Sequence, residues 1–190
     1  MSDPEVLHLA KNLLGQTLSF NGISLMITEV EAYNGSEDQA SHAFKRTKRS
    51  EIMFGPNYRA YVYQIHTHHC LNIVTGPRAQ GAAVLLRAGV ITAGLEKALR
   101  NHSVVKSEVK LASGPGNLAR SLGVNIADKG KPVIQLKTPL SGQQLLPVPY
   151  RQDFAQGEVF LLMGRTTSAF DISCGPRVGV RFAAMQPWRF

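Results

Sequence analysis

The chain has 190 residues, of which 44% are hydrophobic, and no apolar run in it approaches the roughly 20 residues of a membrane-spanning helix. Its length fits one domain, residues 1–190, and its composition excludes a helical membrane protein and a low-complexity chain. Twenty-one lysines and arginines against 13 acidic residues give a net charge of +8, which favours a polyanionic partner such as nucleic acid over a membrane.

The N-terminus and the cysteines indicate the compartment. Residues 1–5 are acidic where a secretory signal is basic, and no apolar segment of the signal type follows them. Cys70 and Cys174 lie far apart and lack zinc-ligand spacing, so we expect free thiols in a reducing environment. The expected location is cytoplasmic, and nucleoid-associated if the protein is bacterial.

The first 33 residues predict a helix followed by a β-hairpin. Apolar residues at helical spacing between Pro4 and Gly15 indicate the helix. Strands are expected over 17–20 and 23–33, because Asn21-Gly22 between them is typical of a type I′ turn. The period-two pattern of the second strand predicts one shared face for the following residues: Ile23, Leu25, Ile27, Glu29, Glu31 and Tyr33.

The remaining pattern predicts an α+β domain. Residues 34–58 read as a long functional loop or short irregular helices, with a basic cluster at 45–49. Two helices are expected, at 91–101 and 117–123. Further strands are expected at 60–66, 69–74, 82–88, 132–136, 158–162 and 177–182. Strands without a regular βαβ rhythm favour one antiparallel sheet with a few helices.

A histidine-rich segment follows the aromatic strand of Tyr61 and Tyr63. If residues 66–70 form a continuous strand, His66, His68 and Cys70 share a face, and a metal site becomes a candidate. The alternative is a turn at these residues, with the interleaved aromatic and polar side chains suited to stacking on nucleobases.

Seven short motifs occur in order along the chain. They are Glu31-Ala32-Tyr33 with His42, Thr47-x-Arg49 with Met53-Phe54, Tyr61-Val62-Tyr63, Asn72, Leu85-Leu86-Arg87-Ala88, Ser113-Gly114-Pro115 and Arg177-Val178-Gly179-Val180. In this order, and over nearly the whole chain, they resemble the alkyladenine (3-methyladenine) DNA glycosylase family of the mammalian type.

The resemblance implies a fold and an activity. The fold is α+β: a single domain with a curved antiparallel β-sheet, surrounding helices and a protruding β-hairpin, similar to the C-terminal domain of formyltransferases. The activity is base excision: a monomeric enzyme flips a damaged purine out of double-stranded DNA and hydrolyses its N-glycosidic bond without metal or cofactor. The product is an abasic site, because the pattern supplies a carboxylate for water activation and not a lysine for Schiff-base attack.

The resemblance also assigns the site. Glu31 corresponds to the general base, and Arg87 to a residue that positions the water. Tyr33 and His42 are expected on one side of the purine and Tyr63 on the other, since aromatic faces bind electron-poor alkylated bases. Asn72 corresponds to the residue that excludes normal guanine.

Two positions depart from the family pattern. His66 stands where the family carries its intercalating residue, often a tyrosine, on a hairpin one residue longer. Ser50 replaces the usual asparagine after Thr47-x-Arg49. Expected substrates are 3-methyladenine and 7-methylguanine, with hypoxanthine and ethenoadenine left unranked.

Basic side chains along the chain are candidates for contacts with the DNA backbone. These are Lys45, Arg46, Lys48, Arg49, Arg59 and Arg177, together with Arg181 and Arg189. Two other functions remain open at this point: a non-catalytic homologue that binds lesion-containing DNA, and a metal-dependent hydrolase built on the histidine-rich turn.

Overall fold

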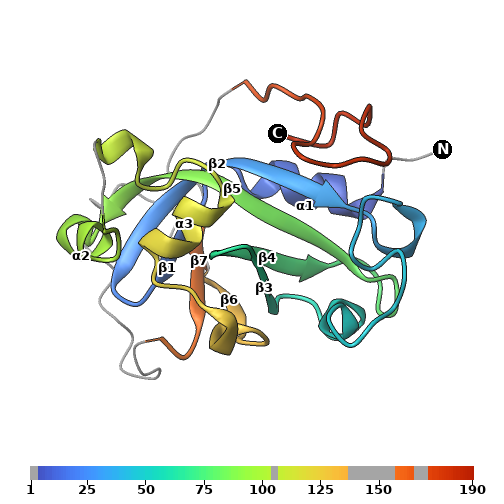
Figure 1. The fold of residues 1–190 in the computed structure, drawn as a ribbon, viewed down its shortest axis with the longest axis horizontal. Coiled ribbons are helices and arrows are strands. Elements are labelled where there is room, and N and C mark those ends of the chain that lie inside the picture. The colour runs from blue at the N-terminus through green and yellow to red at the C-terminus, as the bar shows by residue number, and fades with distance from the viewer. Residues whose placement is uncertain (1–3, 104–106, 137–156, 165–170) are drawn as a thin grey trace.

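The computed structural model describes residues 4–103, 107–136, 157–164 and 171–190. Seven strands form one curled sheet in the order β3-β4-β5-β2-β1-β7-β6 (Figure 1). The strands are β1 Thr17–Phe20, β2 Ile23–Tyr33, β3 Ala60–Ile65, β4 His68–Thr75, β5 Ala82–Ala93, β6 Val133–Leu136 and β7 Phe160–Met163. The α-helices of these residues are α1 Glu5–Leu13, α2 Leu95–Arg100 and α3 Pro115–Ser121, and the 3-10 helices are η1 Gly35–Glu37, η2 Glu51–Phe54, η3 Glu108–Lys110 and η4 Ile126–Asp128. The α+β fold is confirmed.

Most of the sheet is antiparallel, as expected, but one pair is parallel. β6 pairs with β7 in parallel, from Val133 opposite Phe160 to Leu136 opposite Met163. The hairpin of β1 and β2 has the predicted turn, because Asn21 and Gly22 adopt positive φ angles of 52° and 72°. The core lies between the sheet and the helices. It takes Val6, Ala10 and Leu13 from α1 and Leu118 and Ala119 from α3. No helix in the described part of the chain is long and apolar enough to cross a membrane.

A β-bulge in β2 changes which face its side chains occupy. The register with β5 shifts between Ile27 and Val30. Ile23, Leu25 and Ile27 therefore point into the core, but beyond the bulge the core residues are Val30 and Ala32. The predicted common face for all six odd-numbered residues is wrong. Glu31 and Tyr33 lie on the opposite face, away from the main core.

β5 continues through the first part of the segment predicted as a helix. Residues 89–93 pair with β2, so the expected helix at 91–101 is replaced by strand up to Ala93 and by α2 from Leu95. Gly94 makes the break with a φ of 76°, and a Cβ there would meet the Gly22 carbonyl oxygen at 2.5 Å. Pairing with β2 outweighs the weak helical pattern of Ile91 and Thr92, which are β-branched.

The C-terminal residues form no strand at 177–182, which corrects the prediction there. The pairing lies further along: Phe190 exchanges both backbone hydrogen bonds with Val30, and the amide of Ala32 donates to the Trp188 carbonyl oxygen. The segment of residues 171–190, here called the C-terminal tail, runs beside β2 and α1 in Figure 1. It covers the edge of β2 beyond the point where β1 ends.

Candidate active site

One row of residues crosses the sheet and brings the predicted site together. In adjacent strands, Tyr61 of β3 lies opposite Asn72 of β4, Asn72 opposite Leu85 of β5, and Leu85 opposite Glu31 of β2. An isolated bridge to Arg189 in the C-terminal tail completes the row. Positions that are distant in sequence therefore share one face of the sheet.

A cavity of about 390 Å³ lies over this row. Its lining includes the six residues predicted for catalysis and base binding: Glu31, Tyr33, His42, Tyr63, Asn72 and Arg87. The loop of residues 34–58 and the C-terminal tail supply the walls, through residues such as Met53 and Val178. The volume falls within the ~300–1,000 Å³ common for small-molecule pockets, and a nucleobase is a ligand of that class.

The carboxylate of Glu31 is fully buried and is held by donors from three directions. Tyr33 donates its hydroxyl to Oε2 at 2.8 Å, and the backbone amide of Val178 donates to Oε1 at 2.7 Å. The guanidinium of Arg87 forms an ion pair with Oε1 at 3.3 Å. The predicted proximity of Arg87 and Glu31 is confirmed.

Glu29 anchors this arrangement, a role that the sequence did not indicate. Its Oε1 accepts a hydrogen bond from Arg87 Nε at 2.9 Å and another from Arg189 Nη1 at 3.1 Å. The bulge in β2 brings Glu29 to the same guanidinium that contacts Glu31. Arg87 thus bridges two carboxylates, one fully buried and one partly exposed.

Aromatic rings form one side of the cavity. His42 Nδ1 and the Tyr61 hydroxyl lie 3.0 Å apart, and the His42 ring meets Tyr63 edge-on with the centroids 4.6 Å apart. Although His42 as a whole is exposed, the burial of its ring, and after it the charge of Arg49, lower the pKa of His42 to about 4. The imidazole is therefore neutral near pH 7. Asn72 is fixed by donating to the Tyr61 carbonyl oxygen at 3.0 Å.

The two rings expected on opposite sides of a purine touch each other. A base stacked between two rings needs roughly 7 Å, because each stacked contact takes ~3.5 Å. With the 4.6 Å separation of His42 and Tyr63, no base fits between them in this conformation. Binding in the predicted manner requires one of the rings to turn aside.

The guanidinium of Arg177 is buried, which corrects its expected role at the DNA backbone. It is 4% exposed, and its Nη2 donates to Asp38 Oδ1 at 2.9 Å within a buried ion pair. Its Nη1 also donates to the carbonyl oxygen of Ala32. Arg177 therefore locks the C-terminal tail onto β2 and the following loop, and so places the neighbouring amide of Val178 on Glu31.

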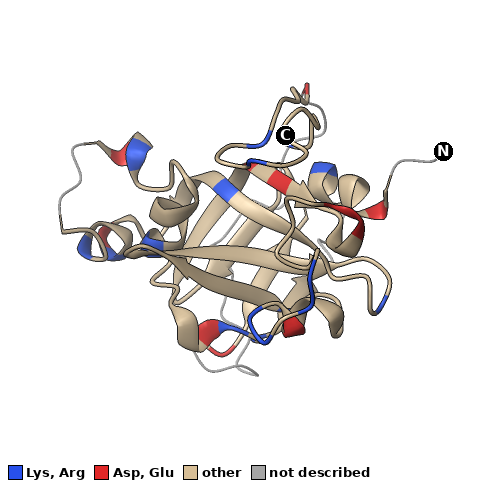
Figure 2. Cartoon of the chain, turned by 45° about the vertical axis from the view of Figure 1, so that its right-hand side comes forward, with Lys and Arg blue, Asp and Glu red and all other residues tan. Residues whose placement is uncertain are grey.

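The other basic candidates differ in their exposure and in whether they already form an ion pair or hydrogen bond. Lys45, Lys48 and Arg49 are exposed, and the Arg49 guanidinium lies 4.9 Å from the centre of the Tyr63 ring. Arg46 is exposed too, but it forms a two-point ion pair with Glu51. The partly buried Arg59 donates to a backbone carbonyl oxygen. Figure 2 shows lysines and arginines spread over helices, loops and the C-terminal tail, and not gathered in one stripe.

His66 lies at the tip of the hairpin formed by β3 and β4. It is exposed, with a φ of 50°, in the two-residue turn between Ile65 and His68. The continuous strand that a metal site required is therefore interrupted. Within the described residues, no group of three His, Cys, Asp or Glu side chains is placed to hold a metal ion.

Comparison with known proteins agrees with this arrangement. The profile of the methylpurine-DNA glycosylase family matches residues 1–190. The chain belongs to this family. A Frankia casuarinae protein provisionally named 3-methyladenine DNA glycosylase is 41% identical, over 99% of this chain and 84% of its own length. Proteins with the same provisional name from Mycobacterium tuberculosis and Cutibacterium acnes are 38% and 36% identical, over 95% and 100% of this chain and 81% and 92% of their own lengths.

Membership of the methylpurine-DNA glycosylase family makes DNA the substrate and base excision repair the process. It does not by itself explain the residues that sequence reasoning missed, namely Glu29, Asp38 and the Val178 amide. The sequence signal for the last of these is the motif Arg177-Val178-Gly179-Val180, in which only Arg177 has a predicted role. Asp38 gave no signal, because an acidic residue in a polar loop is ordinarily solvated.

Proposed function

We propose that the protein is a monofunctional DNA glycosylase that flips alkylated purines out of duplex DNA and hydrolyses the N-glycosidic bond to leave an abasic site. Its primary substrates are 3-methyladenine and 7-methylguanine, and hypoxanthine and ethenoadenine are secondary candidates. The observation that carries the proposal is the fully buried carboxylate of Glu31 beside an aromatic cavity, in a chain of this family.

The contacts of Glu31 support a position for the attacking water at Oε2. Each carboxylate oxygen has two lone pairs. Oε1 faces both the Val178 amide and Arg87, whereas Oε2 accepts a hydrogen bond only from Tyr33 among the described residues. The second lone pair of Oε2 accepts a proton from the water as the water oxygen attacks the sugar C1′. The C1′–N bond breaks, and its electron pair leaves with the base. The negative charge of Glu31 also stabilises the positive charge that builds on the sugar.

The aromatic wall suits a cationic leaving base. An N-alkylated purine carries positive charge, and the faces of Tyr33 and Tyr63 attract it more strongly than they attract a normal base. His42 is neutral near pH 7, so it adds no repulsion, and it turns from Tyr63 to admit the base. Asn72, held by Tyr61, crowds the exocyclic amino group of normal guanine.

The protein acts on the duplex as a monomer. Three exposed cations of the 34–58 loop, Lys45, Lys48 and Arg49, hold the phosphates. His66 at the hairpin tip fills the gap that the flipped nucleotide leaves. Histidine is a smaller wedge than tyrosine, so we expect it to hold the duplex open less firmly.

One assay tests the proposal against its alternatives. Methylated duplex DNA is incubated with the protein and a chelator, and free base and abasic sites are measured. We expect release of 3-methyladenine in chelator, none with Glu31→Gln, and full release with Glu108→Gln, an exposed acid outside the cavity. Tight binding without release identifies a non-catalytic homologue, and loss of release in chelator identifies a metal-dependent hydrolase. A covalent adduct trapped by borohydride contradicts the monofunctional assignment.

A further inference from the structure

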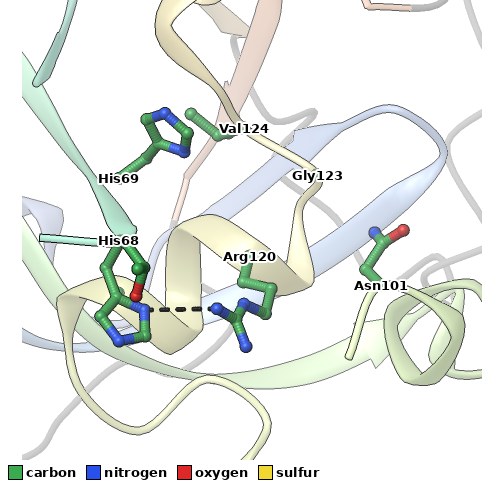
Figure 3. A pocket seen from close by; sticks show the side chains of 8 residues that line it. His68, His69, Asn101, Arg120, Gly123 and Val124 are labelled. Carbon is green, nitrogen blue, oxygen red and sulfur yellow. Dashed lines mark hydrogen bonds between the residues drawn. The ribbon is translucent and has the colours of Figure 1, made fainter. Parts of the chain in front are cut away.

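A second cavity lies where the start of β4 meets α3. It has a volume of about 200 Å³, and its lining includes Thr67, His68, His69, Asn101 and Arg120 (Figure 3). The linings of the two cavities are adjacent in the chain at two places. Ile65 lines the first cavity and Thr67 the second, so along the chain His66 falls between the two linings. Likewise Pro115 lines the first and Gly116 the second, at the start of α3.

Arg120 gives this cavity a positive charge that has no carboxylate partner among the described residues. Its Nη2 lies 3.5 Å from His68 Nδ1, the contact drawn in Figure 3. A guanidinium carries five N–H donors, and this contact uses one. Each ion pair among the described residues involves a cation other than Arg120. The remaining donors are therefore available to an anion.

Gly116 allows His68 to lie beside Arg120. A Cβ at this position would come within 2.9 Å of the His68 Cβ and 3.0 Å of its Cγ. Any larger residue at 116 would push the imidazole off the first turn of α3. The glycine therefore keeps the ring and the guanidinium on the same cavity, and both can present N–H groups to one ligand.

We propose that this cavity, between the hairpin and α3, binds a phosphate group of the DNA backbone apart from the cavity for the flipped base. Its volume of about 200 Å³ is below the ~300–1,000 Å³ of pockets that enclose whole ligands, and suits a group of phosphate size. Arginine with a second N–H donor is the usual recognition of phosphate oxygens. The inference rests on the proposed function for the identity of the ligand. A phosphate bound in this cavity is a further contact with the DNA backbone, and this contact fixes how deeply the hairpin enters the duplex.

The test is the salt dependence of binding to an undamaged duplex. Each phosphate contact contributes ~0.9 to the slope of log K against log salt concentration. We expect Arg120→Gln to reduce that slope by about 0.9, and Arg120→Lys to keep most of it because the charge remains. The matched control is Arg100→Gln, which removes the same charge from an exposed position outside both cavities. Gly116→Ala preserves every charge, and we expect it to reduce the affinity by displacing His68.

An unchanged slope in Arg120→Gln, or an equal reduction in Arg100→Gln, overturns the proposal. A parallel titration with inorganic phosphate, followed through the side-chain NMR signals of Arg120, distinguishes the source of the anion. If free phosphate shifts those signals but the duplex slope is unchanged in Arg120→Gln, the cavity is not a DNA contact. Because the duplex is undamaged, the measurement is independent of base release. If the wild-type protein releases no base from methylated DNA but Arg120→Gln still has the smaller slope, the proposed function is contradicted and the phosphate site is supported.

Discussion

The hydroxyl of Tyr33 donates a hydrogen bond to Oε2 of Glu31 at 2.8 Å, although only one residue separates them along β2. Burial, and after it the charge of the Glu31 carboxylate, raise the pKa of Tyr33 above its usual value, so the phenol keeps the proton that it donates. Tyr33 therefore belongs both to the aromatic wall and to the support of the carboxylate. The two roles can be separated by mutation, since phenylalanine keeps the ring and loses the donor.

Tyr33→Phe is expected to lower the single-turnover rate of base release by about tenfold or more, because a hydrogen bond to a charged group contributes ~1.5–3 kcal/mol. Binding to methylated duplex should change little, since the ring remains. Tyr58→Phe is the control, because Tyr58 is partly buried outside the cavity. A Tyr33→Phe protein with the wild-type rate would show that this hydrogen bond does not position the Glu31 carboxylate.

Glu29→Gln is expected to slow base release by about tenfold, because Arg87 loses a charge-assisted hydrogen bond of ~1.5–3 kcal/mol that holds it beside Glu31. The hydrogen bond from Arg189 to the same oxygen also loses the charge of its acceptor, so the C-terminal tail is less firmly held. Single-turnover kinetics check the rate, and Glu96→Gln, which alters an exposed ion pair on α2, is the control. Equal rates in the two variants would exclude a positioning role for Glu29.

Asp38→Asn is expected to destabilise the fold by about 3–5 kcal/mol, because it leaves the buried guanidinium of Arg177 without its anion. The measurement is urea unfolding followed by circular dichroism. Glu51→Gln breaks a surface ion pair and should leave the unfolding midpoint unchanged. If Asp38→Asn unfolds at the wild-type midpoint, the pair is not what holds the C-terminal tail.

Stability should depend on pH through His42. The pKa of His42 is about 4 in the folded chain and 6.5 ordinarily, so between these values the unfolded state binds a proton that the native state does not. Stability from this residue is present in full above pH 6.5 and is lost as the pH falls toward 4. His42→Gln removes the effect, so the wild type should lose more stability than the variant between pH 7 and about 4.5. If the urea midpoints of the wild type and His42→Gln fall equally over this pH range, His42 does not contribute to the pH dependence of stability.

The sequence predicted which side chains line the cavity better than how they are arranged there. The α+β class, the type I′ hairpin and the pairing of Arg87 with Glu31 followed from local patterns and from the family resemblance. The bulge in β2 did not, although the apolar positions change there from odd numbers (Ile23, Leu25, Ile27) to even numbers (Val30, Ala32), a phase shift that the period-two interpretation passed over. It depends on the partner strand, where a Cβ at Gly89 would come within 2.7 Å of the Met26 carbonyl oxygen.

The other misses have the same cause, which is a contact between distant segments. The first part of the predicted helix at 91–101 is a strand because it pairs with β2. The basic Arg177 is buried because Asp38, 139 positions away, lies against it. The edge-on contact of His42 with Tyr63 likewise depends on how the 34–58 loop packs over β3. Such contacts have no signature in either segment alone.

The hydrogen bond from the Val178 amide to Glu31 joins residues 147 positions apart. A growing polypeptide therefore exposes its acidic strand long before the amide that completes the carboxylate's surroundings has been synthesised. Contacts of such long sequence separation close late, because the chain must first lose the entropy of a large loop. A ribosome-bound chain shortened before residue 177 should consequently be unable to cut glycosidic bonds, whatever DNA it meets. Residue 178 must therefore be synthesised and must fold back onto β2 before the Glu31 carboxylate has all of its donors.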